Sequence, residues 1–156
     1  MGKTPVLRHL GRHDRVSAIS AISVSPRRHR LNLFFQLHLK NIRQQQARDF
    51  LRHLLRHLRG HLYLLWDGGP PHTGRLVRDL ARRVPRLHLV RFPGYAPELN
   101  PDEGVWKLAK AKLANGCPVD SAELLLSVTK ALHAIRGNHR NLRACIRHAG
   151  LPFFAP

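Results

Sequence analysis

The chain has 156 residues, with 27 Lys and Arg against 9 Asp and Glu, and its net charge is +18 with histidine neutral. That length allows one domain, and a hydrophobic content of 43% argues against wholesale disorder. No apolar run reaches the ~18 residues that cross a bilayer, and the first residues lead into no apolar segment of a signal peptide. Two cysteines exclude a disulfide framework and a cysteine-based zinc site. We therefore expect a soluble, intracellular, strongly basic α/β protein.

The positive charge is spread along the whole chain. Residues 1–60 carry 13 Lys and Arg against two acids, and residues 61–156 carry 14 against seven. Such an excess repels itself in a compact domain unless a polyanion takes it up, and nucleic acid is the usual partner. Arginine outnumbers lysine 21 to 6, which suits forked contacts to phosphate. Codon bias explains arginine over lysine but not the scarcity of acids, so the charge favours contact with nucleic acid.

The first elements predict an antiparallel hairpin. Residues 16–24 are small and rich in β-formers, and residues 31–39 alternate between apolar and polar with the period of a strand. Residues 26–30 form the turn between them. Three arginines at this tip are candidates for binding DNA: Arg27, Arg28 and Arg30. The alternative is that they form a solvated turn.

Residues 43–59 predict an amphipathic helix. Its apolar residues recur at a spacing of three to four, and Gly60 ends it. His53 and His57 are spaced as a metal-binding pair could be. A solvated face is the favoured interpretation, because no carboxylate lies beside them.

A strand, a helix and a second strand follow. Residues 62–66 form a short, continuous apolar run, which is typical of a strand buried on both faces. The helix is expected over residues 73–83 and the next strand over residues 87–92. This order implies a right-handed parallel crossover.

Three more helices are predicted in the last third of the chain. Asn100 is a suitable N-cap, and Pro101 suits the first helical position. The expected helices span residues 101–114, 121–136 and 140–148, and the apolar tail 151–156 packs back on them.

Because acids are scarce, each one is informative. Asp67 ends the apolar strand, and ligands of parallel α/β sheets gather at the carboxyl ends of strands. An aspartate there can hold a hard cation such as Mg²⁺. A turn aspartate is an equally good interpretation of the Asp-Gly-Gly-Pro-Pro segment that begins at Asp67.

Glu103 also has two interpretations. It is the third residue after Asn100, where a capping-box carboxylate bonds back to the helix start, and by spacing alone this structural role is favoured. The functional interpretation places Glu103 beside Asp67, with Lys107 and Lys110 further along the same helical face. Carboxylates flanked by lysines suit a metal-assisted attack on a phosphodiester.

Two segments of the chain resemble catalytic blocks of one enzyme family. Residues 92–106 resemble the third block of mariner-like DDE transposases; they read Phe-Pro-Gly-Tyr-Ala-Pro-Glu-Leu-Asn-Pro-Asp-Glu-Gly-Val-Trp. The nearest branch of that family is the bacterial insertion-sequence group, which is classed among the DDE superfamily endonucleases. Residues 64–72 resemble the second block, a strand ending in Asp with a His five residues on. The spacing from Asp67 to Glu103 fits the family, and residues 2–6 resemble the segment before its second strand.

The resemblance implies an RNase H-like fold: a mixed sheet with flanking helices. It implies that Asp67 and Glu103 are the second and third catalytic acids and bind Mg²⁺ or Mn²⁺. The substrates would be transposon ends and target DNA in a bacterial cytoplasm, at the nucleoid, with a homodimer as one expected assembly and no membrane. His72 would lie near the metal site and contact phosphate, although it could simply open the next helix. Lys107 and Lys110 would contact DNA.

The resemblance also has gaps. Gly68 stands where the family commonly has Asn, and Asp102 where it has an aliphatic residue. The family's first acid ends a central strand upstream of the matching segment, and neither Asp14 nor Asp49 is placed to replace it. We therefore expect residues 1–115 to be a partial catalytic domain without its first, central strand, and residues 116–156 to be its helical extension.

Such a piece is expected to be marginally stable and to lack strand-transfer activity alone. The missing part would come from an upstream-encoded transposase half, or the chain is a remnant. The alternative is a non-catalytic basic DNA-binding protein in which Asp67 and Glu103 are structural. An RNA-binding or ribosomal protein is less favoured, because aromatic residues make up only 6% and no stacking platform is visible. Tyr95 and Trp106 are expected in the core.

Overall fold

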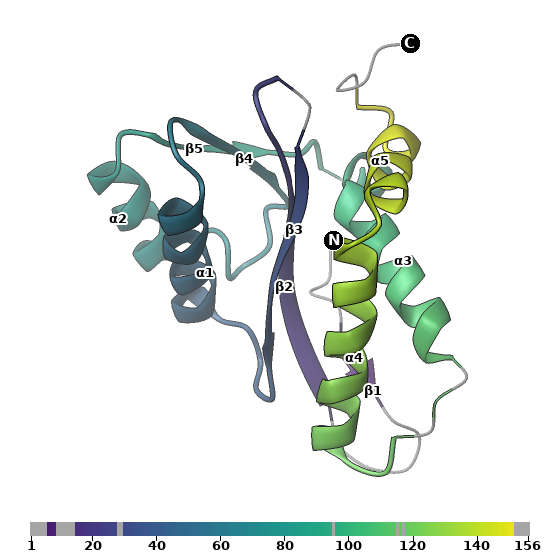
Figure 1. The fold of residues 1–156 in the computed structure, drawn as a ribbon. Helices are drawn as coiled ribbons and strands as arrows, with labels where there is room; N and C mark the ends of the chain where they lie inside the picture. Colours follow the sequence, from purple (N-terminus) through teal and green to yellow (C-terminus); the bar gives the residue numbers. More distant parts are fainter. Residues whose placement is uncertain are drawn as a thin grey trace.

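The elements of the chain form a mixed α/β arrangement (Figure 1). A computed structural model describes residues 6–8, 15–27, 30–94, 96–114, 116 and 118–151. The strands are β1 (Val6–Arg8), β2 (Arg15–Val24), β3 (Leu31–His38), β4 (Leu62–Trp66) and β5 (Leu87–Arg91). The helices are α1 (Gln44–His57), α2 (Arg75–Arg83), the short 3-10 turn η1 (Pro97–Leu99), α3 (Pro101–Leu113), α4 (Ser121–Arg136) and α5 (His139–His148).

The predicted hairpin forms the larger sheet. β2 and β3 pair antiparallel from Val24 opposite Leu31 to Ser17 opposite His38. The strand β1, which the sequence did not predict, adds to the other side of β2 only over Arg15–Ser17. Its three residues are too few to show a strand period.

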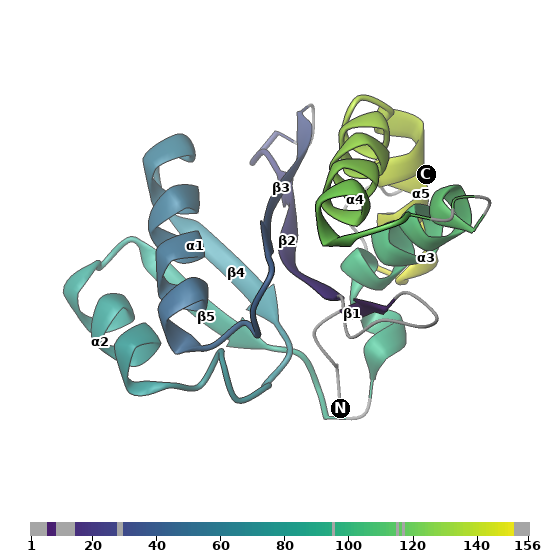
Figure 2. The same cartoon turned by 90° about the horizontal axis from the view of Figure 1, so that it is seen from below.

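The predicted parallel pair forms a second, smaller sheet. β4 and β5 run side by side with Leu62 opposite Leu87 and Trp66 opposite Arg91. The prediction that β4 is buried on both faces is wrong: Tyr63 is 65% exposed and Leu65 is 38% exposed. The side chains that alternate with them pack against α1 and α2, which cover one face of this pair (Figure 2). A continuous apolar run does not reveal that the second face lacks a covering helix.

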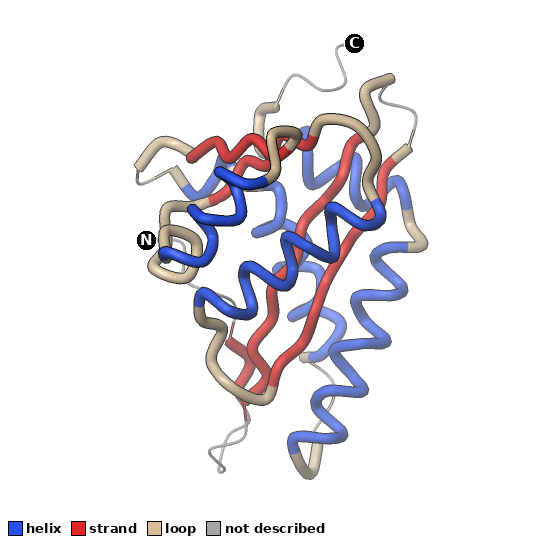
Figure 3. The backbone as a smooth tube through the Cα atoms, turned by 90° about the vertical axis from the view of Figure 1, so that its left-hand side faces the viewer, coloured by secondary structure: helices blue, strands red, loops and turns tan. Residues whose placement is uncertain are grey.

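The two sheets are not joined by strand pairing within the described residues. Residues 18–24 of β2 pair with β3 on one side, and no described strand lies on the other. Among the described strands, β4 likewise pairs with β5 alone, on one side. Figure 3 shows the long β2–β3 ribbon running separately from the shorter β4–β5 pair. The expected gap between two groups of strands is therefore present in the described part of the chain, and it leaves unpaired backbone edges.

Two apolar clusters hold these layers together. One packs α3, α4 and α5 onto the β2–β3 ribbon, and it contains Trp106, which is 3% exposed. The other joins α1 and α2 to the β4–β5 pair and to Ile19 and Phe34 of the ribbon. The ribbon is thus covered by helices on both faces, and Trp106 belongs to the core as predicted. Tyr95 lies outside the described residues.

Local signals set most helix ends. α1 ends before Gly60, whose φ of 74° lies in the left-handed region that glycine adopts without steric cost. Arg86 donates to carbonyls in the last turn of α1 and just beyond it: to Leu55 O, to Leu58 O at 2.8 Å and to Gly60 O at 2.9 Å. In the part of the chain that the structure describes, no helix has the length and apolarity to cross a membrane.

Candidate carboxylate site

Asp67 lies directly after β4 and is held by the turn that follows. Its Oδ1 is 2.6 Å from Nδ1 of His72 and accepts a hydrogen bond from the Gly69 N–H at 3.3 Å. The ring of His72 stacks on Trp66 with 4.6 Å between centroids, and its backbone N–H donates to Gly69 O at 2.9 Å. Asp67 is therefore a turn residue, as one interpretation of the sequence held. Its Oδ2 accepts no hydrogen bond from the described residues, so this oxygen can still bind a cation.

The surroundings of Asp67 favour its charged form. Partial burial would raise the pKa of this carboxyl, but the hydrogen bond and charge of His72 and the amide of Gly69 together hold the pKa below its ordinary value. A metal ion binds the ionised carboxylate. His72 thus positions Asp67 and stabilises the state in which it can act as a ligand.

Helix α1 supports the loop between Asp67 and α2. Oε1 of Gln44 accepts a hydrogen bond from the Leu76 N–H at 3.2 Å, which satisfies one free amide at the start of α2. A Cβ at Gly74 would lie 2.6 Å from Cβ of Gln44, so only glycine permits this close approach. The loop that carries Asp67 and His72 is therefore fixed at both ends, by β4 and by α1.

Glu103 lies in the first turn of α3, and its side chain is exposed. The predicted N-cap is confirmed: Oδ1 of Asn100 accepts from the Asp102 N–H at 3.1 Å, and the Glu103 N–H donates to Asn100 O at 3.1 Å. The carboxylate of Glu103 makes no hydrogen bond back to the helix start among the described residues. The structural interpretation of this side chain as a capping-box acid is therefore not realised, and the carboxylate is available for other contacts.

Asp102 is an acid whose position the sequence did not reveal. Its Oδ2 accepts hydrogen bonds from Ser20 Oγ at 2.7 Å and from Trp106 Nε1 at 3.1 Å. Trp106 Nε1 also donates to Ser20 Oγ at 3.0 Å. These three side chains tie α3 to β2 across more than 80 residues of sequence. The Oδ1 of Asp102 is shielded from solvent and has no hydrogen-bond partner among the described residues.

The pKa of the Asp102 carboxyl is raised above its ordinary value. Its burial raises the pKa, the hydrogen bonds from Ser20 and Trp106 lower it, and the charges of Glu103 and Asp67 raise it, with a result of about 6. In Figure 2 the carboxyl end of β4 points towards the side of the molecule on which α3 lies.

The donor types fit a hard divalent cation, but the set is small. Asp67 and Glu103 offer carboxylate oxygens, which Mg²⁺ and Mn²⁺ prefer. Among the described residues, no group of three or more His, Cys, Asp or Glu side chains converges as metal ligands would. Asp67 and Glu103 therefore remain two candidate ligands whose oxygen donors suit such an ion.

The other predicted site residues lie in three places. Lys107 and Lys110 are exposed on α3, one and two turns beyond Glu103. Arg27 and Arg30 are exposed at the hairpin tip, and Arg28 lies outside the described residues. His72 contacts Asp67 rather than standing apart from it, so its place near this acid is as expected. Whether these side chains touch DNA stays a prediction.

Comparison with known proteins supports the predicted fold. A family model described as DDE superfamily endonuclease matches residues 1–125. The crystal structure of the catalytic domain of Mos1 mariner transposase is similar with a TM-score of 0.57 and 16% identity, over 94% of this chain and 79% of that one. The Mos1 catalytic domain with raltegravir and Mg gives a TM-score of 0.59 and 13% identity, over 94% and 80%.

A third similar structure is a simian T-cell lymphotropic virus intasome, with a TM-score of 0.57 and 13% identity over 86% of this chain and 46% of that one. A search of curated proteins found no match. At these identities the structural matches establish the fold, which is the RNase H-like fold of the Mos1 catalytic domain. The predicted fold class is therefore confirmed.

Proposed function

Because this chain belongs to the DDE superfamily endonucleases, we propose that it is the C-terminal part of a transposase catalytic domain of the bacterial insertion-sequence branch. In this function it contributes to cleaving transposon ends and joining them to target DNA. The observation that carries the proposal is the pair of candidate ligands: Asp67 at the end of β4 keeps one oxygen unbonded, and Glu103 is exposed at the start of α3. With such a substrate we expect the protein at the nucleoid of a bacterial cytoplasm, and a homodimer is the assembly that we expect there.

Asp67 and Glu103 would hold Mg²⁺ or Mn²⁺. When bound, such an ion stabilises the attacking and leaving oxygens of an in-line displacement at phosphorus. Support comes from the donor chemistry of the two carboxylates and from the Mg in one of the similar structures. His72 keeps Asp67 ionised and oriented. Lys107 and Lys110, exposed on the same helix as Glu103, would neutralise the phosphates of the bound strand.

The unpaired edges of the two sheets suggest where the remaining acid comes from. An extended strand that ends in Asp would pair with residues 18–24 of β2 and with β4, and its acid would lie near Asp67. Strand addition to an open edge is a known mode of recognition. We therefore place an upstream-encoded transposase half in this gap, as the partner that completes the catalytic site.

The test compares the purified chain with a mixture of the chain and the upstream half. Mg²⁺-dependent nicking of transposon-end DNA is expected only in the mixture. In the mixture, Asp67→Asn and Glu103→Gln should each abolish nicking while DNA binding is retained. The exposed acid Asp49 provides the matched control, because Asp49→Asn should leave nicking unchanged. Robust turnover by the chain alone would refute the need for a partner. Unchanged nicking in both site variants, or no nicking in any mixture, would instead favour a non-catalytic DNA-binding protein.

A further inference from the structure

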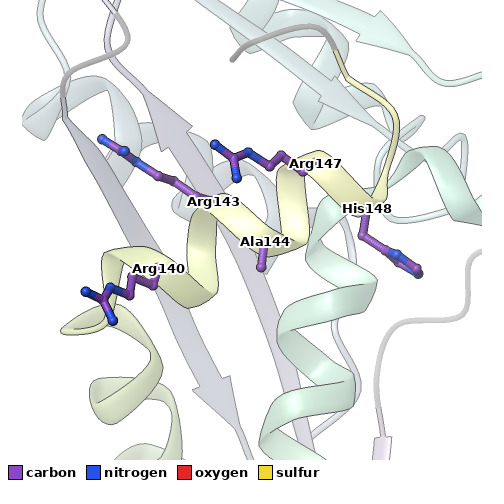
Figure 4. Close-up of a pocket in the computed structure, with 5 residues that line it drawn as sticks. All are labelled: Arg140, Arg143, Ala144, Arg147 and His148. Atoms are coloured by element: carbon purple, nitrogen blue, oxygen red, sulfur yellow. The ribbon is translucent and has the colours of Figure 1, made fainter. Parts of the chain in front are cut away.

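Helix α5 carries an arginine-rich surface that the family match does not reach. The match ends at residue 125, and α5 begins at His139. An open groove of about 680 Å³ is lined by Arg140, Arg143, Ala144, Arg147 and His148 (Figure 4). All five residues are exposed. In Figure 4 the three arginines leave the helix on one side, and His148 leaves it on the other. We call the three arginines the α5 arginine surface.

Helical geometry explains why these arginines share one face. Arg140 and Arg147 are two turns apart, which corresponds to about 10 Å along the axis and about 20° around it. Arg143 lies between them. The opposite face of α5 is apolar and packs into the core that α3, α4 and the β2–β3 ribbon share; its members are Leu142, Cys145 and Ile146. The packing of the apolar face therefore fixes the helix, so that the backbone positions of the three arginines follow one another along its exposed side.

The sequence around this surface contains no acidic side chain. The last acid of the chain is Glu123, and residues 124–156 contain five Lys and Arg and no Asp or Glu. Within the described residues, Arg140 and Arg147 form no ion pair with an acid. The positive charges of Arg140 and Arg147 are therefore directed at solvent, where they attract anions.

We propose that the α5 arginine surface binds the phosphate backbone of duplex DNA, as a second contact beyond the carboxylate site. The inference rests on the proposed function for the identity of the polyanion. Three arginines spread over about 10 Å of helix offer more guanidinium groups than one free phosphate can contact, whereas a nucleic-acid backbone presents successive phosphates. Guanidinium groups match phosphate through paired hydrogen bonds.

Two features support DNA over an anionic membrane. A helix that binds a membrane surface inserts an apolar face into it, but the apolar face of α5 is already buried in the core. In addition, α5 packs against β3, which begins one residue after Arg30 of the basic hairpin tip. The two basic elements therefore lie on neighbouring parts of the fold.

The experiment measures binding of the full chain to a short DNA duplex by fluorescence anisotropy, in EDTA and over a series of salt concentrations. The test variant is R140Q/R143Q/R147Q. The control variant R52Q/R56Q/R59Q removes the same charge from exposed positions in and just after α1. Each phosphate contact contributes about 0.9 to the slope of log K against log salt. The test variant should lower this slope by about 2 to 3, with roughly tenfold weaker binding or more, and the control by less than about 1.

Several outcomes separate the alternatives. Lysine at all three test positions keeps the charge and should restore most of the slope. Equal loss in the test and control variants would mean that only net charge matters, and the proposal would fail. It would also fail if the test variant kept its DNA affinity but lost binding to phosphatidylserine vesicles. Circular dichroism establishes that each variant is folded. Since binding is measured without metal, absence of cleavage would count against the proposed function and leave this result intact.

Discussion

The half-buried acid Asp102, whose Oδ1 is shielded from solvent, yields a quantitative prediction for stability. Its pKa rises from 3.8 to about 6 in the folded chain. The folded state therefore holds this proton more tightly than the unfolded state does. The stability that this group contributes is greatest below pH 3.8, declines as the pH rises towards 6, and is absent above it. The rise in the pKa of Asp102 from 3.8 to about 6 corresponds to a loss of about 3 kcal/mol of stability between the two limits.

Asp102→Asn removes the charge and keeps an oxygen that can accept from Ser20 and Trp106. The variant should be more stable than the natural chain at pH 7, by about 1–2 kcal/mol, because the new amide group also needs a partner in a shielded position. At pH 4 the difference in the free energy of unfolding between the variant and the natural chain should vanish or change sign. The measurement is urea unfolding of both proteins at steps between pH 4 and pH 7, in EDTA.

The difference between the two proteins isolates the contribution of Asp102, because the twelve histidines are present in both. Asp49→Asn serves as the control, because Asp49 is exposed on α1 and this change should leave the pH dependence as it is. Parallel pH profiles for the natural chain and Asp102→Asn would refute the reasoning, since they would mean that the Asp102 carboxyl is solvated in the folded state.

Three further changes test the packing and the site. Gly104→Ala should destabilise the chain by about 1–3 kcal/mol, read as a lower Tm, because the new Cβ would lie 2.9 Å from Sγ of Cys145. Arg86→Met should cost about 1–3 kcal/mol and speed hydrogen exchange at the end of α1, where three carbonyls lose their donor. His72→Ala should raise the pKa of Asp67, measured by NMR titration of its carboxyl carbon, and weaken Mn²⁺ binding near pH 5 more than at pH 8.

Matched variants control the first two of these changes. A Cβ at Gly94 would meet no atom within 4 Å, so Gly94→Ala should leave the Tm unchanged. Arg83 is exposed in the last turn of α2, and Arg83→Met should not alter exchange in α1. Equal effects of a test variant and its control would contradict the contact assigned to it. An unchanged pKa of Asp67 in His72→Ala would show that the turn alone holds this acid.

Most elements were predictable because their residues encode them locally. The alternation in residues 31–39 and the apolar stripe of residues 43–59 correspond to β3 and α1. Asn100 caps α3 through its own side chain, and the position of Asp67 at the end of β4 follows from the apolar run before it. Each of these signals depends on neighbours within a few residues, so no tertiary information is needed to read it.

The environment of the acids was not predictable in the same way. Asp102 follows a proline in the first turn of α3 and has no unusual local pattern, yet it is bonded to Ser20 of a distant strand. The bond between His72 and Asp67 is partly local, but the resulting pKa depends on burial by surrounding elements. The arginines of α5 have a visible helical spacing, which was a signal for the α5 arginine surface that the sequence interpretation did not use.

By itself, the sequence determined the order and kind of the main elements, the family, and the two carboxylates that stand at their ends. Periodicity, caps and motifs are properties of contiguous residues, and a linear chain displays them directly. Only the tertiary structure decided that one face of β4 stays exposed, that the two sheets do not pair in the described part, and that Asp102 is shielded between α3 and β2. Burial and strand pairing depend on which distant surfaces meet, and that information is not contained in any short segment.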